Sequence, residues 1–153
     1  MDFFHFHIQM IQRSTGRSAV AAAAYRSGAR IVNTWDGTVH DYTRKQHVVY
    51  NEVMLPANAP PHFADRSVLW NSVEWAEKKR DAQLAREVEM ALPKELPRTA
   101  QIKLVRAFVQ QQFVDAGMCA DVAIHDKEDG NPHAHILLTV RPLNSDGSWA
   151  QKS

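Results

Sequence analysis

Hydrophobic and polar residues alternate near both ends of the chain. Residues 3–11 place Phe6, Ile8 and Met10 on one side and histidine or glutamine on the other, which predicts a half-buried strand. Short segments of apolar, β-favouring residues predict three further strands, at residues 86–93, 119–126 and 133–140. A glycine-containing turn separates the last two segments, so we expect them to form a hairpin.

A second hairpin signal lies in residues 34–56. The dipeptide Asp36-Gly37 is typical of a tight turn, and Val48 and Val49 begin a run that favours a strand. We therefore expect two paired strands in this segment, after the first helix.

Three segments have the composition or the apolar spacing of helices: residues 18–31, 65–85 and 97–117. The first is rich in alanine, the residue with the highest helix propensity. Ser18 is expected to cap the start of this helix and Gly28 to end it, while Thr99 and Gly117 play the same parts for the third helix.

The predicted element order is β-α-β-β-α-β-α-β-β. It indicates an α+β domain with a mostly antiparallel central sheet of about five strands, helices packed on one face and the other face free to carry a site. The length of 153 residues suits a single domain over 1–153. The chain ends without an evident closing element, so we expect it to be the N-terminal part of a longer protein.

Composition narrows the class of protein. With 44% hydrophobic and 23% charged residues the chain is expected to fold, and a formal net charge of +1 excludes a strongly basic protein that wraps duplex DNA. A lone cysteine, Cys119, fits a reducing cytoplasm. No apolar run approaches the roughly 20 residues that a membrane-spanning helix needs, and the first residues do not resemble a signal peptide.

Three histidines converge in the predicted C-terminal hairpin. On a strand, His133 and His135 share one face while Ala134 and Ile136 point into the core, and the hairpin folds His125 back beside them. Three neutral imidazoles with open positions are typical of a catalytic metal site that accepts Zn, Mn, Ni or Co. Solvated polar surface on an exposed sheet face is the alternative.

Tyr25 is the one large polar side chain on the alanine-rich helix. A phenol becomes a nucleophile when a base takes its proton or when positive charge lowers its pKa. Glu87 and Glu89 share one face of a short strand and could serve as that base or orient a histidine. A tyrosine packed where helix and sheet meet, with solvated glutamates, explains the same residues without chemistry.

Four segments together resemble the MobA/MobL family of conjugative DNA relaxases, which are HUH endonucleases, and in particular the N-terminal relaxase domain of TraA-like proteins. They are residues 5–28, 41–60, 86–93 and 125–139, and they occur in the order of the family. The segment HDKEDGNPHAHILLT matches the three-histidine motif, with the small Ala134 between the last two histidines. The tyrosines precede this motif, which favours a relaxase over a rolling-circle replication initiator.

The resemblance implies residue roles. Tyr25 is the nucleophile, and the metal ligands are His125, His133 and His135. The acidic pair is Glu87 and Glu89, of which Glu89 is preferred. The cofactor is a divalent metal ion (Mn, Mg, Zn, Ni or Co). Residues expected along the DNA backbone are Arg17, Arg26, Arg44, Lys45 and Arg141; an exposed, solvated surface explains the same charges.

The implied function is strand-specific nicking of single-stranded DNA at an origin of transfer, in plasmid mobilisation or conjugative transfer. Tyrosine transesterification would leave a 5′-phosphotyrosyl link and a free 3′-OH. Relaxosome accessory proteins and a type IV secretion coupling protein are the expected partners, in the bacterial cytoplasm. Two alternatives stay open, a metal-dependent phosphodiester hydrolase and a non-catalytic single-stranded DNA-binding module.

Overall fold

The computed structural model describes residues 6–152, and a five-stranded sheet is its centre. The strand order is β1-β5-β7-β6-β4, and each neighbouring pair is antiparallel. The strands are β1 (His7–Gln12), β4 (Val48–Met54), β5 (Gln83–Ala91), β6 (Ala120–His125) and β7 (His133–Leu138). The predicted α+β class, with an antiparallel sheet, is confirmed. The part of the predicted first strand at residues 3–5 lies outside the described residues.

A separate two-stranded sheet follows the first helix. β2 (Arg30–Val32) and β3 (Val39–Asp41) form the hairpin expected around Asp36-Gly37, where Gly37 has a φ of 77°. The expectation that the strand beginning at Val48 closes this hairpin is wrong, because β4 leaves it and pairs with β6. β6 is buried along nearly its whole length and requires a hydrogen-bonding neighbour on each side, which β7 and β4 supply.

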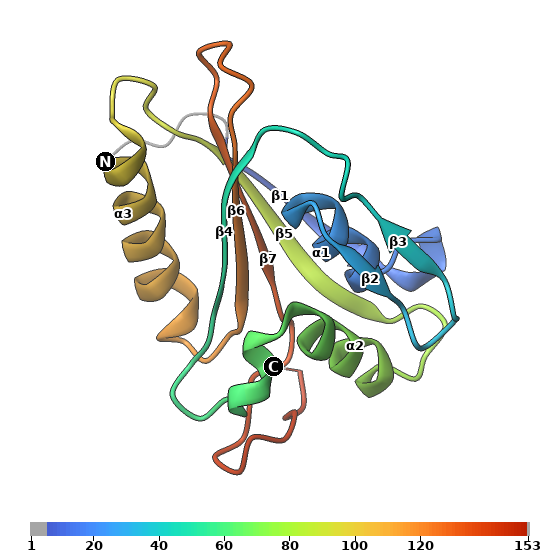
Figure 1. Ribbon diagram of the computed structural model, residues 1–153. Helices are drawn as coiled ribbons and strands as arrows, with labels where there is room; N and C mark the ends of the chain where they lie inside the picture. Colours follow the sequence, from blue (N-terminus) through green and yellow to red (C-terminus); the bar gives the residue numbers. More distant parts are fainter. Residues whose placement is uncertain (1–5, 153) are drawn as a thin grey trace.

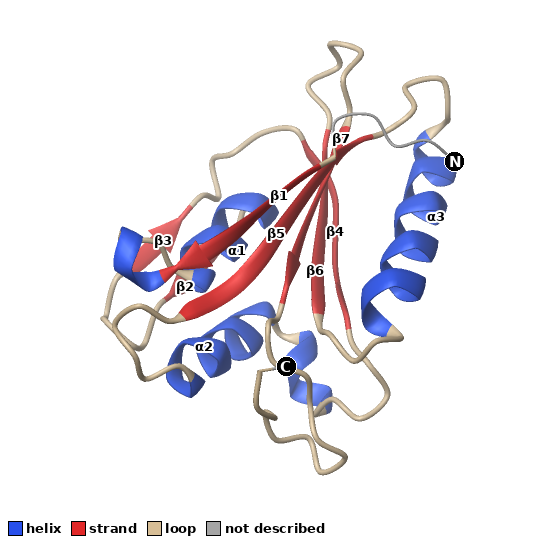
Figure 2. Cartoon of the chain, turned by 180° about the vertical axis from the view of Figure 1, so that it is seen from behind, coloured by secondary structure: helices blue, strands red, loops and turns tan. Residues whose placement is uncertain are grey.

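Helices cover both faces of the sheet, so the prediction that they pack on one face is wrong (Figures 1 and 2). α1 (Ala19–Ser27) and α2 (Arg66–Ala76) lie on one face, and α3 (Arg98–Val109), continued by a π-helical turn, lies on the other. The cause is visible in β7, whose Leu137 packs toward α1 and α2 while Ile136 and Leu138 pack toward α3. Apolar residues on both faces of a strand require a cover on both faces.

Two predicted boundaries differ from the structure. The second helix ends at Ala76 and not near residue 85, because the charged segment after it turns back and Leu84 and Ala85 enter β5 beside β1. Thr99 lies inside α3, whose N-cap is Pro97 and has no side-chain cap. The expected ends of α1 are confirmed: the Ser18 side chain accepts a hydrogen bond from Ala21 N, and Gly28 adopts a left-handed C-cap. No helix in residues 6–152 is long and apolar enough to span a bilayer.

Candidate active site

The β6–β7 hairpin brings the three histidines together. His125 lies directly opposite His133 in the hairpin. His135 lies two residues after His133 on the same face of β7, opposite Ala123. The rings of His125 and His135 are tilted by 39° with 4.3 Å between their centroids. Because the intervening residues enter the core under α3, all three imidazoles face α1.

Burial keeps two of these imidazoles neutral. Loss of solvent lowers the pKa of His125 to about 4, and the charges of Lys45 and Arg26 act in the same direction. Loss of solvent also lowers the pKa of His135 to about 2, again assisted by the charge of Arg26. At neutral pH both rings therefore keep a lone pair, which is the state that a metal ligand requires.

Tyr25 reaches the same place from α1. It lies in the last turns of that helix, and its side chain is 43% exposed, so it is not a tyrosine packed inside the seam between helix and sheet. One open hollow of about 500 Å³ is lined by Tyr25, Lys45, Glu89 and the three histidines. We call it the histidine hollow.

The two predicted carboxylates have different surroundings. Glu87 is 3% exposed and accepts hydrogen bonds from Arg26 (2.7 and 3.2 Å) and from Gln9 (3.0 Å). Burial raises its pKa, but the hydrogen bonds and charge of Arg26 outweigh burial, and the net pKa is lowered. Glu89 lies beside His135 in the sheet register and forms no side-chain hydrogen bond or ion pair with another described residue. Glu89 is therefore the carboxylate that is free to act in the histidine hollow.

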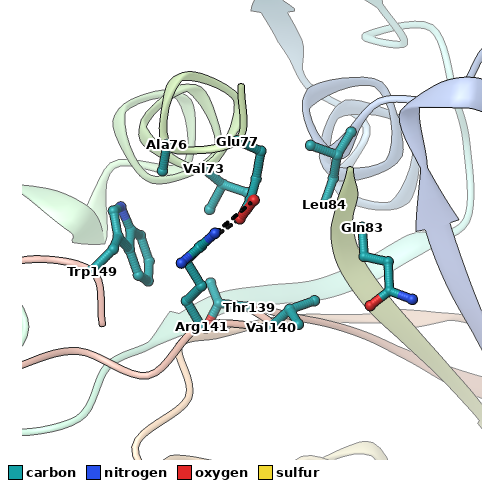
Figure 3. A pocket seen from close by; sticks show the side chains of 9 residues that line it. All are labelled: Val73, Ala76, Glu77, Gln83, Leu84, Thr139, Val140, Arg141 and Trp149. Atoms are coloured by element: carbon teal, nitrogen blue, oxygen red, sulfur yellow. Dashed lines mark hydrogen bonds and ion pairs between the residues drawn. The ribbon is translucent and has the colours of Figure 1, made fainter. Parts of the chain in front are cut away.

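The basic residues separate into two groups. Arg17, Arg26 and Lys45 lie around Tyr25, and Arg44 is exposed in the same loop as Lys45. Arg141 lies at the other end of the sheet, where its guanidinium donates to the Glu77 carboxylate (2.5 and 3.2 Å; Figure 3). It also donates to the Ala150 carbonyl (3.1 Å). Arg141 therefore does not lie with the other basic residues expected along a DNA path, because Glu77 and the Ala150 carbonyl hold its guanidinium elsewhere.

The sequence model of the MobA/MobL family matches residues 17–153. The chain belongs to the MobA/MobL family. It is 44% identical over 162 residues to the conjugal transfer protein TraA of Agrobacterium fabrum, and this match covers 99% of the present chain and 15% of TraA. It is 37% identical over 178 residues to the mobilization protein MobL of Acidithiobacillus ferridurans, and this match covers 100% of the present chain and 46% of MobL. The chain thus spans less than half the length of either protein.

A solved structure supports the same relationship. The structure described as "Molecular Basis of Vancomycin Resistance Transfer in Staphylococcus aureus" has a TM-score of 0.93 and 35% sequence identity. The match covers 100% of this chain and 77% of the other. The predicted membership of the family of relaxase and mobilisation proteins of conjugal transfer is confirmed.

The donors of this MobA/MobL domain fit a divalent cation in chemistry. His133 Nδ1 donates to the Asn131 carbonyl (2.7 Å), which leaves its Nε2 outside that bond, and His135 Nδ1 is buried without a hydrogen-bond partner among residues 6–152. His125 Nε2 donates to the Arg26 carbonyl (2.7 Å). Within residues 6–152, no three histidine, cysteine or acidic side chains are gathered as a finished metal site. The three imidazoles could hold a cation once His125 gives up its hydrogen bond to the Arg26 carbonyl and turns to the cation.

One important residue of this MobA/MobL domain was not found by sequence reasoning. Glu74 of α2 is 1% exposed and accepts hydrogen bonds from Ala19 N (2.7 Å) and Val20 N (3.4 Å), at the start of α1, the helix that carries Tyr25. Arg13 pairs with the same carboxylate at 3.1 Å. A glutamate in an amphipathic helix normally faces solvent, so the sequence contained no signal for a buried cap that comes from another helix.

Proposed function

We propose that this domain is a site- and strand-specific DNA relaxase that nicks single-stranded DNA at an origin of transfer by tyrosine transesterification. One observation carries the proposal: Tyr25 of α1, Glu89 of β5 and the histidines of β6 and β7 line the same hollow. These residues are up to 110 positions apart in the chain, which is the difference between His135 and Tyr25. A hydroxyl, a carboxylate and neutral imidazoles around one open space suit the transfer of a phosphoryl group.

In the proposed reaction the Tyr25 oxygen attacks the phosphorus of one DNA phosphodiester. The bond between this oxygen and phosphorus forms as the bond from phosphorus to the 3′-oxygen breaks. The phenol proton is lost, Glu89 being the acceptor that its surroundings favour, and the leaving 3′-oxygen takes up a proton. The products are a 5′-phosphotyrosyl link and a free 3′-OH. One phosphodiester replaces another, so the reverse attack reseals the strand.

The other residues position the phosphate and hold charge. A divalent cation held by His125, His133 and His135 would supply Lewis-acid stabilisation of the phosphate oxygens. Arg26 is held against Glu87 beside Tyr25, so its guanidinium contributes a fixed positive charge to the same edge of the hollow. Glu87 acts in this scheme by placing Arg26, and not as the base.

The partners and setting follow from the family. We propose that the substrate is single-stranded DNA from a plasmid origin of transfer, and that the domain works in the bacterial cytoplasm. Relaxosome accessory proteins and a type IV secretion coupling protein would then receive the covalent complex. The names of the relatives, a conjugal transfer protein and a mobilization protein, agree with this setting.

The decisive test uses overlapping single-stranded oligonucleotides from the DNA that flanks the gene, each labelled at its 3′ end, with Mn²⁺ or Mg²⁺. A 5′-phosphotyrosyl link keeps the 3′-labelled fragment on the protein, so a labelled band should survive denaturation. Tyr25→Phe should abolish this band, and the matched Tyr50→Phe, on β4, should keep it.

Two other results would favour the alternatives. Strand cleavage that persists in Tyr25→Phe without a covalent band would identify a phosphodiester hydrolase. Binding of single-stranded DNA without cleavage under any divalent cation would identify a binding module.

A further inference from the structure

Lys45 lies against the ring of Tyr25. Its Nζ atom is 3.5 Å from the ring centroid, and the same ammonium donates a hydrogen bond to the Tyr25 backbone carbonyl at 2.9 Å. An ammonium over an aromatic face is attracted by the ring quadrupole. Lys45 therefore holds both the backbone and the side chain of the tyrosine.

The loop that carries Lys45 is fixed at several points. Tyr42 N donates to the Ala29 carbonyl (3.0 Å), and Lys45 N donates to the Tyr42 carbonyl (2.9 Å). The Tyr42 ring meets the Tyr25 ring edge to face, with 5.1 Å between centroids and 86° between planes. Further along the loop, the His47 carbonyl accepts a hydrogen bond from the backbone N of Asp126 (3.0 Å), the residue that follows His125. One loop thus contacts Tyr25 and the histidine hairpin together.

The contact also completes the end of α1. The last carbonyls of a helix lack partners within the helix. In α1 the carbonyl of Ala24 accepts from Ala29 N, that of Tyr25 from Lys45, and that of Arg26 from His125. A cation at a helix C-terminus is favoured by the helix dipole. The turn that bears Tyr25 is therefore tied to Lys45 and to His125, and of the two only the bond to Lys45 would remain once His125 turned to a cation.

The ammonium of Lys45 is partly removed from solvent. The pKa of Lys45 is lowered to about 8, mainly by burial; the charges of Arg26 and Lys127 act in the same direction, and the charge of Glu87 opposes them. The partial burial of Lys45 agrees with a residue engaged within the protein.

We propose that Lys45 is a positioning residue for Tyr25: it clamps the last turn of α1 and one face of the phenol, so that the hydroxyl stays in the histidine hollow. This inference rests on Tyr25 being the nucleophile of the proposed reaction. It differs from the role expected from the sequence, in which Lys45 is a contact to the DNA backbone. A backbone contact contributes to DNA affinity, whereas a clamp on the nucleophile contributes to the rate at saturating DNA.

The kinetic test compares Lys45→Met, Lys45→Arg and a control, Lys103→Met, in which the same charge is removed from the exposed face of α3. The rate of covalent-band formation at saturating DNA is measured separately from the DNA concentration that gives half that rate. Lys45→Met should slow the saturated rate by about tenfold to a hundredfold, the range for a misplaced reacting group. The half-saturating concentration should change little, and Lys45→Arg should recover most of the rate, because a guanidinium can donate and stack in the same place.

An unchanged saturated rate in Lys45→Met, or a loss of DNA affinity alone, would overturn the proposal. NMR of the lysine side chains tests the clamp without DNA. The Lys45 ε-methylene signals should be shifted upfield by the Tyr25 ring, and Tyr25→Leu should remove the shift. Shifted signals in a protein that forms no covalent band would sink the proposed function and leave the clamp intact. Ordinary signals in an active wild type would sink the clamp alone.

Discussion

The substitution Glu74→Ala removes the buried carboxylate that caps the tyrosine helix. Ala19 N and Val20 N lose their acceptor, and Arg13 loses its ion-pair partner. The site is almost completely buried, with Glu74 at 1% exposure, so water does not readily replace the lost contacts. The perturbation acts on α1 from outside that helix, and it substitutes no residue that lines the histidine hollow.

The expected cost is large for one residue. Breaking a buried, hydrogen-bonded ion pair by removing one partner costs about 3–5 kcal/mol. For a domain of this size, about 1 kcal/mol corresponds to a change of roughly 2–4 °C in Tm, so we expect Tm to fall by roughly 6–20 °C. Because the lost contacts cap α1, part of this free energy is lost from the helix that carries Tyr25. The rate of covalent-band formation should therefore also fall.

The assay is urea denaturation followed by circular dichroism, with two matched variants. Ser18→Ala removes only the half-buried N-cap of the same helix and should cost about 1 kcal/mol. Glu95→Ala removes an exposed carboxylate and should stay within about 0.5 kcal/mol of wild type. A Glu74→Ala protein as stable as Glu95→Ala would refute the reasoning, because the carboxylate would then contribute nothing as a cap.

Three further outcomes are expected. In metal-free protein, the free energy of unfolding should fall as pH drops below about 6.5. The unfolded chain takes up protons on histidines there, whereas folded His125 accepts a proton only near pH 4 and folded His135 near pH 2. The slope of the free energy of unfolding against pH should be smaller in His125→Asn than in wild type, and identical slopes would contradict the prediction. A divalent cation at 100 times its Kd should stabilise the wild type by about 2.7 kcal/mol, whereas the double variant His133→Ala/His135→Ala should show no thermal shift. Glu87→Gln should cost about 1.5–3 kcal/mol, the range for hydrogen bonds to a charged group, since it leaves Arg26 without its counter-charge; equal urea midpoints would contradict this.

Local patterns in the sequence predicted local structure well. Ser18 and Gly28 bound the tyrosine helix as expected, because capping depends on residue type and on neighbours within one turn. The face of β7 followed from its alternation, and the register of a short hairpin placed His125 opposite His133. The fold class and the convergence of the three histidines were therefore accessible from the sequence.

Long-range partners were not accessible in this way. Nothing within residues 48–54 distinguishes a hairpin partner of β3 from an edge strand beside β6, since both require the same alternation. Glu74 and Arg141 each have a buried or paired role that depends on an element distant in the chain. The charge of Arg141 alone indicated DNA, and the charge of Glu74 gave no sign that it is buried. The helices on both faces likewise follow from the packing of the whole sheet.

The central claim is that Tyr25 is the attacking group, and peptide mass spectrometry of the denatured covalent complex tests it most directly. Digestion with nuclease and then trypsin should leave a nucleotide on the peptide 18–26, which contains Tyr25 and no other tyrosine. Fragmentation should place the added mass of a nucleoside 5′-phosphoryl group, a nucleoside monophosphate less one water, on that tyrosine. A nucleotide found on Tyr42, Tyr50 or any other residue, with peptide 18–26 unmodified, would contradict the account.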